Sequence, residues 1–352
     1  MTVNRPNRPI YLDYQATTPC DPRVVDRMLP YFSDIFGNPH SADHRHGWEA
    51  EAAVETARGQ VATLIGAKPR DIIFTSGATE SNNLAIKGAA RHRRQAEGRD
   101  TVITLASEHK CVLESTARLG REGFDVKVLP IQKNGLLDLS TLKAALGDRV
   151  SIVSVMAANN EIGVIQPLAD IGAMARECGA WFHTDAAQAF GKYPLDVDAM
   201  CIDMMSISGH KIYGPKGVGA LYVRGRKPKV ELDPLMDGGG QERGLRSGTL
   251  PVPLCVGLGA AADIAKSEMG QEAERLTRMR NRLWDLLQQS DADLSLNGDL
   301  DQRLPGNLNI TVPGVESSEL LAALDGLSVS SGSACSSGAQ AASHVLQALG
   351  HD

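Results

Sequence analysis

The segment TSGATESNN, residues 75 to 83, has the residue types of an anion-binding turn. It leaves the apolar run IIFT through Gly77 and leads into a helical pattern, so backbone N–H groups and the positive end of a helix dipole face the turn. The missing side chain of Gly77 lets the backbone approach a ligand, and the hydroxyl of Thr79 adds a donor. The segment predicts a phosphate site, although a simple strand-to-helix turn has the same residue types.

The segment WFHTDAAQ, residues 181 to 188, puts His183 and Asp185 at the carboxyl end of another apolar run. Open α/β sheets bind their ligands at this edge. Asp185 is compatible with two roles. It could cap the N-terminus of a helix, or it could hold a proton on a heterocyclic nitrogen, as an aspartate does for the pyridine ring of pyridoxal phosphate. Gln188 is expected near the same place.

The segment SISGHKIYGPKGVGAL, residues 206 to 221, places Lys211 in a glycine-rich loop after a third apolar run. Such a lysine is either a solvated surface charge or a desolvated amine that can form a Schiff base with an aldehyde. Ser208 and His210 flank it with possible phosphate donors, and His210 is also compatible with a structural role. Together, the three segments offer a phosphate cradle, a carboxylate for a ring nitrogen and an amine, in the order found in pyridoxal phosphate enzymes.

Seven short β-rich runs must position these segments, and they alternate with helical patterns between residues 70 and 225. Several runs are almost continuously apolar and do not alternate, which is typical of strands covered by helices on both faces. The sequence therefore predicts an α/β fold with a mostly parallel seven-stranded sheet. The runs cover residues 71–75, 101–105, 125–129, 150–156, 181–185, 204–208 and 219–223, and apolar spacing predicts crossover helices at 80–88 and 168–177.

After about residue 250 the pattern changes to an Ala- and Gly-rich helix that runs to about Ser267, followed by a second, charged helix. A strand-like run at 307–312 and helical patterns at 317–324 and 345–349 predict a smaller α+β domain. We expect residues 21–262 to form the large cofactor-binding domain and residues 1–20 with 263–352 to form the small one. The Ser-, Ala- and Gly-rich stretch 328–343 predicts a mobile loop.

Composition excludes several classes of protein. The chain carries 36 Lys and Arg against 42 Asp and Glu, a net charge of −6, which argues against direct binding of nucleic acid. No run of 18 apolar residues predicts a membrane span, and the first residues resemble no targeting segment, so we expect a cytoplasmic protein. The six cysteines lie at least 23 positions apart, which excludes CxxC pairs, and we predict no metal site. We expect reduced thiols, and buried small hydrophobic side chains at Cys20, Cys111, Cys178, Cys201 and Cys255.

On its motifs, the chain resembles the cysteine desulfurases of iron–sulfur cluster assembly, within the class V aminotransferase superfamily. The resemblance covers nearly the whole chain, and several of the motifs are almost diagnostic. They are YLDYQATTP (11–19), FGNPHS (36–41), FTSGATESNNLAIKG (74–88), SEHK (107–110), NNEIG (159–163), HTDAAQ (183–188), SGHKIYGPKG (208–217), RSGTLP (246–251) and SSGSACSSG (330–338). The resemblance implies the fold type I architecture of pyridoxal phosphate-dependent aminotransferases.

The same resemblance implies a role for each motif residue. Lys211 binds pyridoxal 5'-phosphate covalently and removes the substrate α-proton, Asp185 supports the pyridine nitrogen, and His109 stacks on the ring. Gln188 and Asn160 contact the phenolic oxygen and the substrate side of the ring. The phosphate is bound by Gly77, Ala78, Thr79, Ser208, Gly209 and His210, with Thr249 reaching the phosphate of the partner subunit in a homodimer.

The resemblance also assigns Cys335, in the loop motif SSGSACSSG, as the catalytic thiolate. It takes sulfur from L-cysteine as a persulfide, releases L-alanine and carries the sulfur to acceptor scaffold proteins, for iron–sulfur clusters and for tRNA thiolation. The loop resembles the long-loop group, which hands sulfur to scaffold proteins.

Family members usually continue beyond the position of Asp352 with a strand whose arginine binds the substrate carboxylate. We therefore expect impaired substrate binding in this chain. Two alternatives follow: an idle or impaired pyridoxal phosphate-binding interaction protein, and another class V aminotransferase or lyase, such as a selenocysteine lyase.

Overall fold

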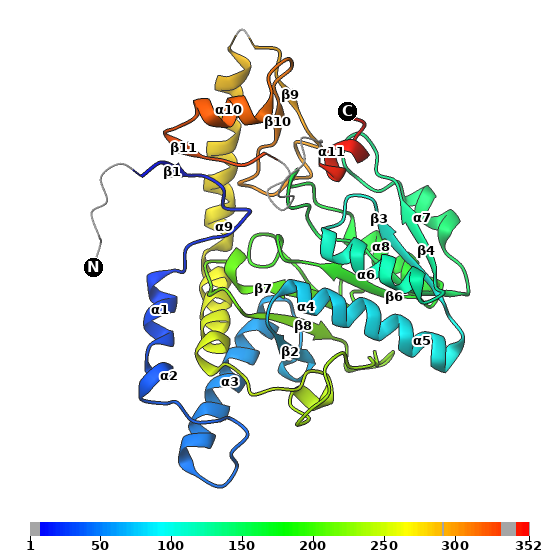
Figure 1. Ribbon diagram of the computed structural model, residues 1–352, viewed down its shortest axis with the longest axis vertical. Helices are drawn as coiled ribbons and strands as arrows, with labels where there is room; N and C mark the ends of the chain where they lie inside the picture. The colour runs from blue at the N-terminus through cyan, green and yellow to red at the C-terminus, as the bar shows by residue number, and fades with distance from the viewer. Residues whose placement is uncertain (1–7, 291, 332–342, 352) are drawn as a thin grey trace.

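The computed structural model describes residues 8–290, 292–331 and 343–351. Its centre is a seven-stranded sheet with helices on both faces (Figure 1). The strands are β2 (Ile72–Thr75), β3 (Thr101–Leu105), β4 (Asp125–Leu129), β5 (Val150–Ser154), β6 (Trp181–Asp185), β7 (Met204–Ser208) and β8 (Gly219–Val223). Each of the seven runs predicted between residues 70 and 225 contains a strand, although the strand in the run 150–156 already ends at Ser154.

The strand order is β2-β8-β7-β6-β5-β3-β4, and only β8 runs against its neighbours. All other pairings in this sheet are parallel, which confirms the mostly parallel sheet. The carboxyl ends of β2, β3, β5, β6 and β7 therefore meet at one edge. The turns that follow these strands carry the motifs singled out from the sequence.

Alternating side chains of each strand pack against two separate cores. On β2, Phe74 contributes to one core and Ile73 to the other. Burying each such side chain contributes about 1.5–3 kcal/mol, which explains why the runs are apolar on both faces. The first core includes residues of α3 (Arg45–Leu64), α7 (Leu139–Ala145), α8 (Leu168–Glu177) and α9 (Val252–Gln288). The second includes residues of α5 (Ala89–Glu97), of α6 (Lys110–Arg121) and of the π-helical turn that joins α4 (Ala78–Asn83) to α5.

The helix predicted at 80–88 begins earlier, at Ala78, and continues further than expected. A π-helical turn, Leu84–Gly88, joins α4 to α5 without leaving the right-handed helical region. The predicted helix at 168–177 coincides with α8.

The expectation of two helices after residue 250 is wrong, because α9 is a single helix of 37 residues. Its first half contributes Cys255 and Leu258 to the core, whereas Met279 and Leu283 in its second half are exposed. The change of composition near Ser267 therefore marks the point where one helix leaves the core (Figure 1).

A smaller region surrounds the end of α9, as Figure 1 shows. It contains two short sheets: β1 pairs with β11 in parallel, and β9 with β10 antiparallel. The pairing of β1 with β11 joins the N-terminal segment to the C-terminal part of the chain, which is compatible with the predicted small domain. The boundaries of the two domains stay a prediction. The elements are β1 (Ile10–Tyr11), β9 (Ser295–Leu296), β10 (Ile310–Thr311), α10 (Ser317–Ala323), β11 (Leu327–Ser328) and α11 (His344–Ala348), and α1 (Pro22–Met28) and α2 (Pro30–Ser33) precede α3.

None of the helices within the described ranges has both the length and the apolar content needed to cross a membrane.

Candidate active site

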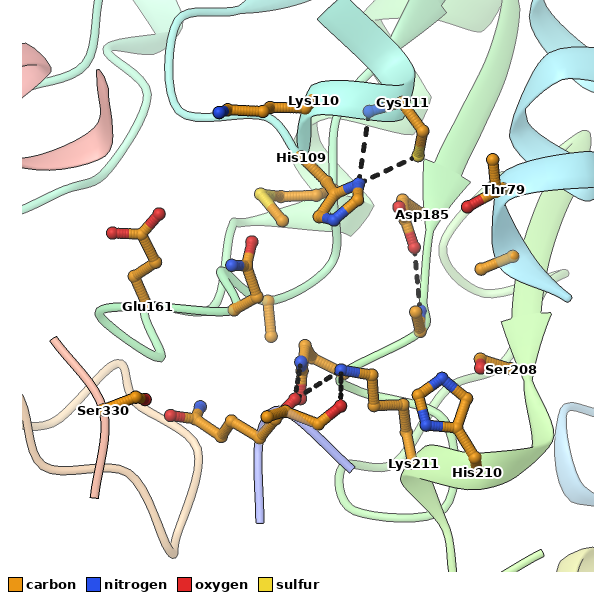
Figure 2. A pocket seen from close by; sticks show the side chains of 18 of the residues that line it. Thr79, His109, Lys110, Cys111, Glu161, Asp185, Ser208, His210, Lys211 and Ser330 are labelled. Carbon is orange, nitrogen blue, oxygen red and sulfur yellow. Dashed lines mark hydrogen bonds between the residues drawn. The ribbon is translucent and has the colours of Figure 1, made fainter. Parts of the chain in front are cut away.

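A cavity of about 880 Å³ lies at the carboxyl edge of the sheet. Ten residues singled out from the sequence line it, and Figure 2 shows several of them around the same space. They are Gly77, Ala78, Thr79, His109, Asn160, Asp185, Gln188, Ser208, His210 and Lys211. The parallel strands bring these distant segments together because each ends at the same edge.

Three of the predicted site residues are not part of this lining. Gly209 is buried and donates its N–H to the carbonyl oxygen of Val218. Thr249 is exposed and lies outside the cavity of its own chain. Cys335 lies outside the described residues, as does most of the predicted mobile loop.

Lys211 ends a short 3-10 turn that follows β7. Its Nζ donates to the carbonyl oxygens of Gln15 and Ala16, the second at 2.9 Å. Gln188 Nε2 donates to the same Gln15 carbonyl at 2.9 Å. The N-terminal segment thus covers a half-buried amine, and the alternative of a solvated surface charge is wrong.

Asp185 ends β6 and is buried. Its Oδ1 accepts the N–H of Ala187 at 2.9 Å, and its Oδ2 accepts Nδ2 of Asn82 at 2.7 Å. A turn follows Asp185 and no helix begins there, so the alternative of a helix cap is wrong. Two neutral donors therefore orient a carboxylate toward the cavity.

The neighbouring Glu108 is fully buried, and its Oε1 accepts the N–H of Met156 at 2.7 Å. Burial, with a smaller contribution from Asp185, raises the pKa of Glu108 well above its usual value. Burial thus favours the neutral form of Glu108 beside the carboxylate of Asp185.

Gly77 is the N-cap of α4, and no side chain caps this helix end. Its φ of +151° and ψ of 177° belong to a region that only glycine adopts readily, and a Cβ there would meet open space. The first N–H groups of the helix are thus available to an anion in the cavity. Ser208 and His210 line the same part of the site, where burial and then Lys211 lower the pKa of His210 to about 4.

His109 is the N-cap of α6, and its Nδ1 accepts the backbone N–H of Cys111 at 3.2 Å. Burial lowers the pKa of its imidazole, an effect that Lys211 adds to and that Asp185 opposes. Burial and Lys211 therefore both favour the neutral form of the ring. By contrast, His183 is fully buried inside the sheet between Ser154 and Ser206, at 2.8 and 3.0 Å, and has a structural role.

Cys111 is a residue that the sequence analysis placed incorrectly. It lines the cavity, and burial raises the pKa of its thiol to about 12. The general expectation of buried cysteines holds for Cys255 alone, whereas Cys20, Cys111, Cys178 and Cys201 are partly exposed, and all five are free thiols. Their exposure depends on neighbouring elements, which single residues in the sequence do not reveal.

The cavity is also lined, on the side near α11, by residues that no sequence motif had indicated as part of the site. Ser343 Oγ donates to Oε2 of Glu161 at 2.5 Å, and His344 Nε2 lies 2.8 Å from the carbonyl oxygen of Glu108. Burial raises the pKa of Glu161 to about 7. Ser331 and Ser343, the described residues on either side of residues 332–342, both line the cavity.

Across the described part of the chain, no group of three His, Cys, Asp or Glu side chains is placed to hold a metal ion. The groups that are present suit an organic ligand instead: an uncapped helix end for an anion, an amine, and a carboxylate for a basic nitrogen. The imidazole of His109 and the amide of Gln188 line the same cavity.

The fold and the site together are those of a pyridoxal phosphate-type enzyme, and the chain belongs to the aminotransferase class-V family, whose model matches residues 10–349. It is 57% identical to the cysteine desulfurase IscS of Rickettsia bellii over 344 residues, covering 98% of this chain and 83% of that protein. Among solved structures it is similar to a NifS-like protein, with a TM-score of 0.89, 37% identity, and coverage of 98% of this chain and 90% of that chain. It also matches a structure described as SspA in complex with cysteine, with a TM-score of 0.85, 41% identity, and coverage of 97% and 95%.

Proposed function

We propose that this chain is a cysteine desulfurase that uses pyridoxal 5'-phosphate to convert L-cysteine to L-alanine. The sulfur passes to Cys335 as a persulfide and serves iron–sulfur cluster assembly and tRNA thiolation. The observation that carries the proposal is the meeting of Lys211, Asp185 and the uncapped end of α4 in one cavity. The cysteine desulfurases among its relatives support the choice of substrate.

The cavity has a matching group for each polar part of the cofactor. The N-terminus of α4, with Ser208 and His210, suits the phosphate, and Asp185 suits the pyridine nitrogen. The buried Oε1 of Gln188 has no hydrogen-bond partner among the described residues, and the phenolic hydroxyl would satisfy it. The residues present therefore fit pyridoxal phosphate.

When bound, the cofactor would supply an electron sink for negative charge on the substrate α-carbon. The chain supplies the remaining functions. The amine of Lys211 takes the α-proton, and the carbonyl groups of Gln15 and Ala16 that hold this amine keep it at the cavity wall. The imidazole of His109 lines the cavity and would cover one side of the cofactor ring, where it would exclude water.

The sulfur step belongs to Cys335. Its thiolate attacks the substrate sulfur, the substrate C–S bond breaks, and the electron pair stays with the carbon that becomes the methyl group of alanine. Because Ser331 and Ser343 line the cavity, the segment that carries Cys335 begins and ends at the site. This arrangement supports the assignment of Cys335 as the sulfur acceptor.

The proposal includes a cytoplasmic homodimer that delivers sulfur to scaffold proteins. Large apolar side chains are exposed on and after α2, with exposed fractions of 60% at Phe32, 66% at Phe36 and 55% at Trp48. A second copy would bury such side chains. The exposed Thr249 is then available for the phosphate of the partner subunit.

A spectroscopic titration tests the cofactor part. Addition of pyridoxal phosphate should produce an absorbance band that Lys211→Ala abolishes and that Lys110→Ala, a change of another cavity-lining lysine, retains. If the unaltered chain gives no such band, the cofactor assignment is wrong.

Mass spectrometry tests the sulfur part. After exposure to L-cysteine, the holoenzyme should carry one extra sulfur on Cys335 and should release alanine. Cys335→Ser should lose both products, and Cys178→Ser, a change of a thiol outside the cavity, should keep them. Alanine formation that survives Cys335→Ser would instead favour another lyase of this family.

A further inference from the structure

The imidazole of His109 is held at one of its two nitrogens. Nδ1 lies 3.2 Å from the backbone nitrogen of Cys111 and 3.0 Å from Sγ of the same residue (Figure 2). Because a backbone N–H can only donate, Nδ1 is the acceptor and carries no proton. The neutral ring must then carry its proton on Nε2.

The thiol contact has a direction as well. Asn82 Nδ2 lies 2.7 Å from Oδ2 of Asp185 and 3.1 Å from Sγ of Cys111, so its two N–H bonds serve one acceptor each. Since Sγ accepts from Asn82 and the thiol is protonated at neutral pH, its own proton is available to Nδ1 of His109. A chain of hydrogen bonds thus runs from Asp185 through Asn82 and Cys111 to His109.

We propose that Cys111 is a positioning residue: its thiol and backbone N–H together fix His109 as the tautomer with the proton on Nε2, and Asn82 links this pair to Asp185. The place of His109 in the fold acts in the same direction. As the N-cap of α6, the ring lies at the positive end of a helix, which disfavours the imidazolium form.

Charged and titratable groups face His109 from several elements. Asp185 at the end of β6 favours the imidazolium, whereas Lys211 after β7, His344 on α11 and Lys110 on α6 disfavour it. Burial is the largest influence and also favours the neutral ring. The tautomer should therefore persist through the neutral pH range.

A ring fixed in this way has one hydrogen-bond donor, Nε2–H, and no unoccupied acceptor. Under the proposed function, His109 is then a stacking group and hydrogen-bond donor, and removal of the α-proton is left to Lys211. This consequence rests on the proposed function. The tautomer itself rests only on contacts within the chain, so the two can fail separately.

Nitrogen-15 NMR of the full chain labelled at histidine, without cofactor, measures the tautomer directly. A His109→Gln variant assigns the signals. We expect an unprotonated Nδ1 and a protonated Nε2 in the unaltered chain, with no change across neutral pH. A proton on Nδ1 would overturn the proposal without any variant being needed.

Two variants then isolate the thiol. Cys111→Ala removes the Sγ donor, so the preference for the Nε2–H tautomer should fall by about twofold to tenfold and His109 should protonate at higher pH. Cys111→Ser keeps a donor and should restore both properties. Identical spectra for Cys111→Ala and the unaltered chain would show that the thiol has no positioning role.

His44 is an internal control, because its Nδ1 accepts the N–H of Gly47 at 3.2 Å at the N-terminus of α3. Among the described residues, no thiol is hydrogen-bonded to His44, so its signals should be the same in every variant. A chain that shows the expected tautomer at His109 but forms no alanine from cysteine would refute the proposed function and leave this proposal standing.

Discussion

Removal of the Glu242 carboxylate should destabilise the fold far more than removal of an exposed acid. Its side chain is 3% exposed and binds both terminal nitrogens of Arg58, at 2.7 and 2.8 Å. It also accepts the backbone N–H of Phe74, in β2, at 2.6 Å. Glu242→Ala leaves a buried guanidinium and a buried N–H without this partner.

The size of the effect follows from these contacts. Breaking one partner of a buried ion pair costs about 3–5 kcal/mol. Because Glu55 still contacts Nε of Arg58 at 2.9 Å, we expect the lower end of this range, about 3 kcal/mol. For a chain of 352 residues, that loss corresponds to a decrease in Tm of about 4 °C.

Urea and thermal denaturation at fixed cofactor concentration measure this loss. Asp263→Ala is the matched control, because Asp263 and Arg27 form an ion pair at 3.0 Å in which both side chains are 47% exposed. The control should cost less than about 1 kcal/mol. The double variant Arg58→Met with Glu242→Leu should be more stable than Glu242→Ala, since no buried charge is left.

Two results would refute this reasoning. One is a Glu242→Ala variant that loses no more stability than Asp263→Ala. The other is a double variant that is less stable than Glu242→Ala alone, because the cost would then come from lost packing and not from an unpaired charge.

Three further predictions follow. Gly219→Ala should weaken cofactor binding by roughly tenfold or more, as measured by fluorescence titration. The new Cβ would lie 2.3 Å from the carbonyl oxygen of Ile207 and 2.6 Å from Cα of Gly77, and would therefore displace the turn proposed to bind the phosphate. An unchanged affinity for the cofactor would contradict this prediction. Burial lowers the pKa of His183 to about 3, so the unfolded chain takes up this proton first as the pH falls below about 6.5. Stability should then decrease by up to about 1.4 kcal/mol per pH unit toward pH 3, and denaturation at several pH values should show a smaller decrease in His183→Gln. Burial raises the pKa of Cys111 to about 12, so at pH 8 iodoacetamide should modify it at least about a hundredfold more slowly than free cysteine, as measured by mass spectrometry.

The strands of the large sheet were predictable because their signal is local. A strand buried on both faces is mostly apolar along its length, as β2 and β8 are. The extent of α9 was not predictable in this way. Its composition changes near Ser267 because its surroundings change from core to surface, and a local reading interprets such a change as a helix end.

The residues of the site likewise include some that local sequence predicts and some that it does not. Asp185 ends a predicted strand, and Gly77 and Lys211 follow two others. Side chains at the carboxyl ends of parallel strands meet at one edge of the sheet. Cys111 was misread as a buried hydrophobic side chain, because its role depends on Asn82, which lies 29 positions away in the sequence. No local pattern distinguishes such a thiol from one in the core.

The sequence by itself determined the class of fold and the kinds of chemical group at the strand ends, since both depend on residues adjacent in the chain. Only the tertiary structure decided which atoms those groups contact. The carbonyl of Gln15 holds Lys211, the amide of Asn82 holds Asp185, and the thiol of Cys111 reaches His109. Hydrogen bonds act over about 3 Å and depend on angle, so they are fixed only when the packed cores set the distances between elements.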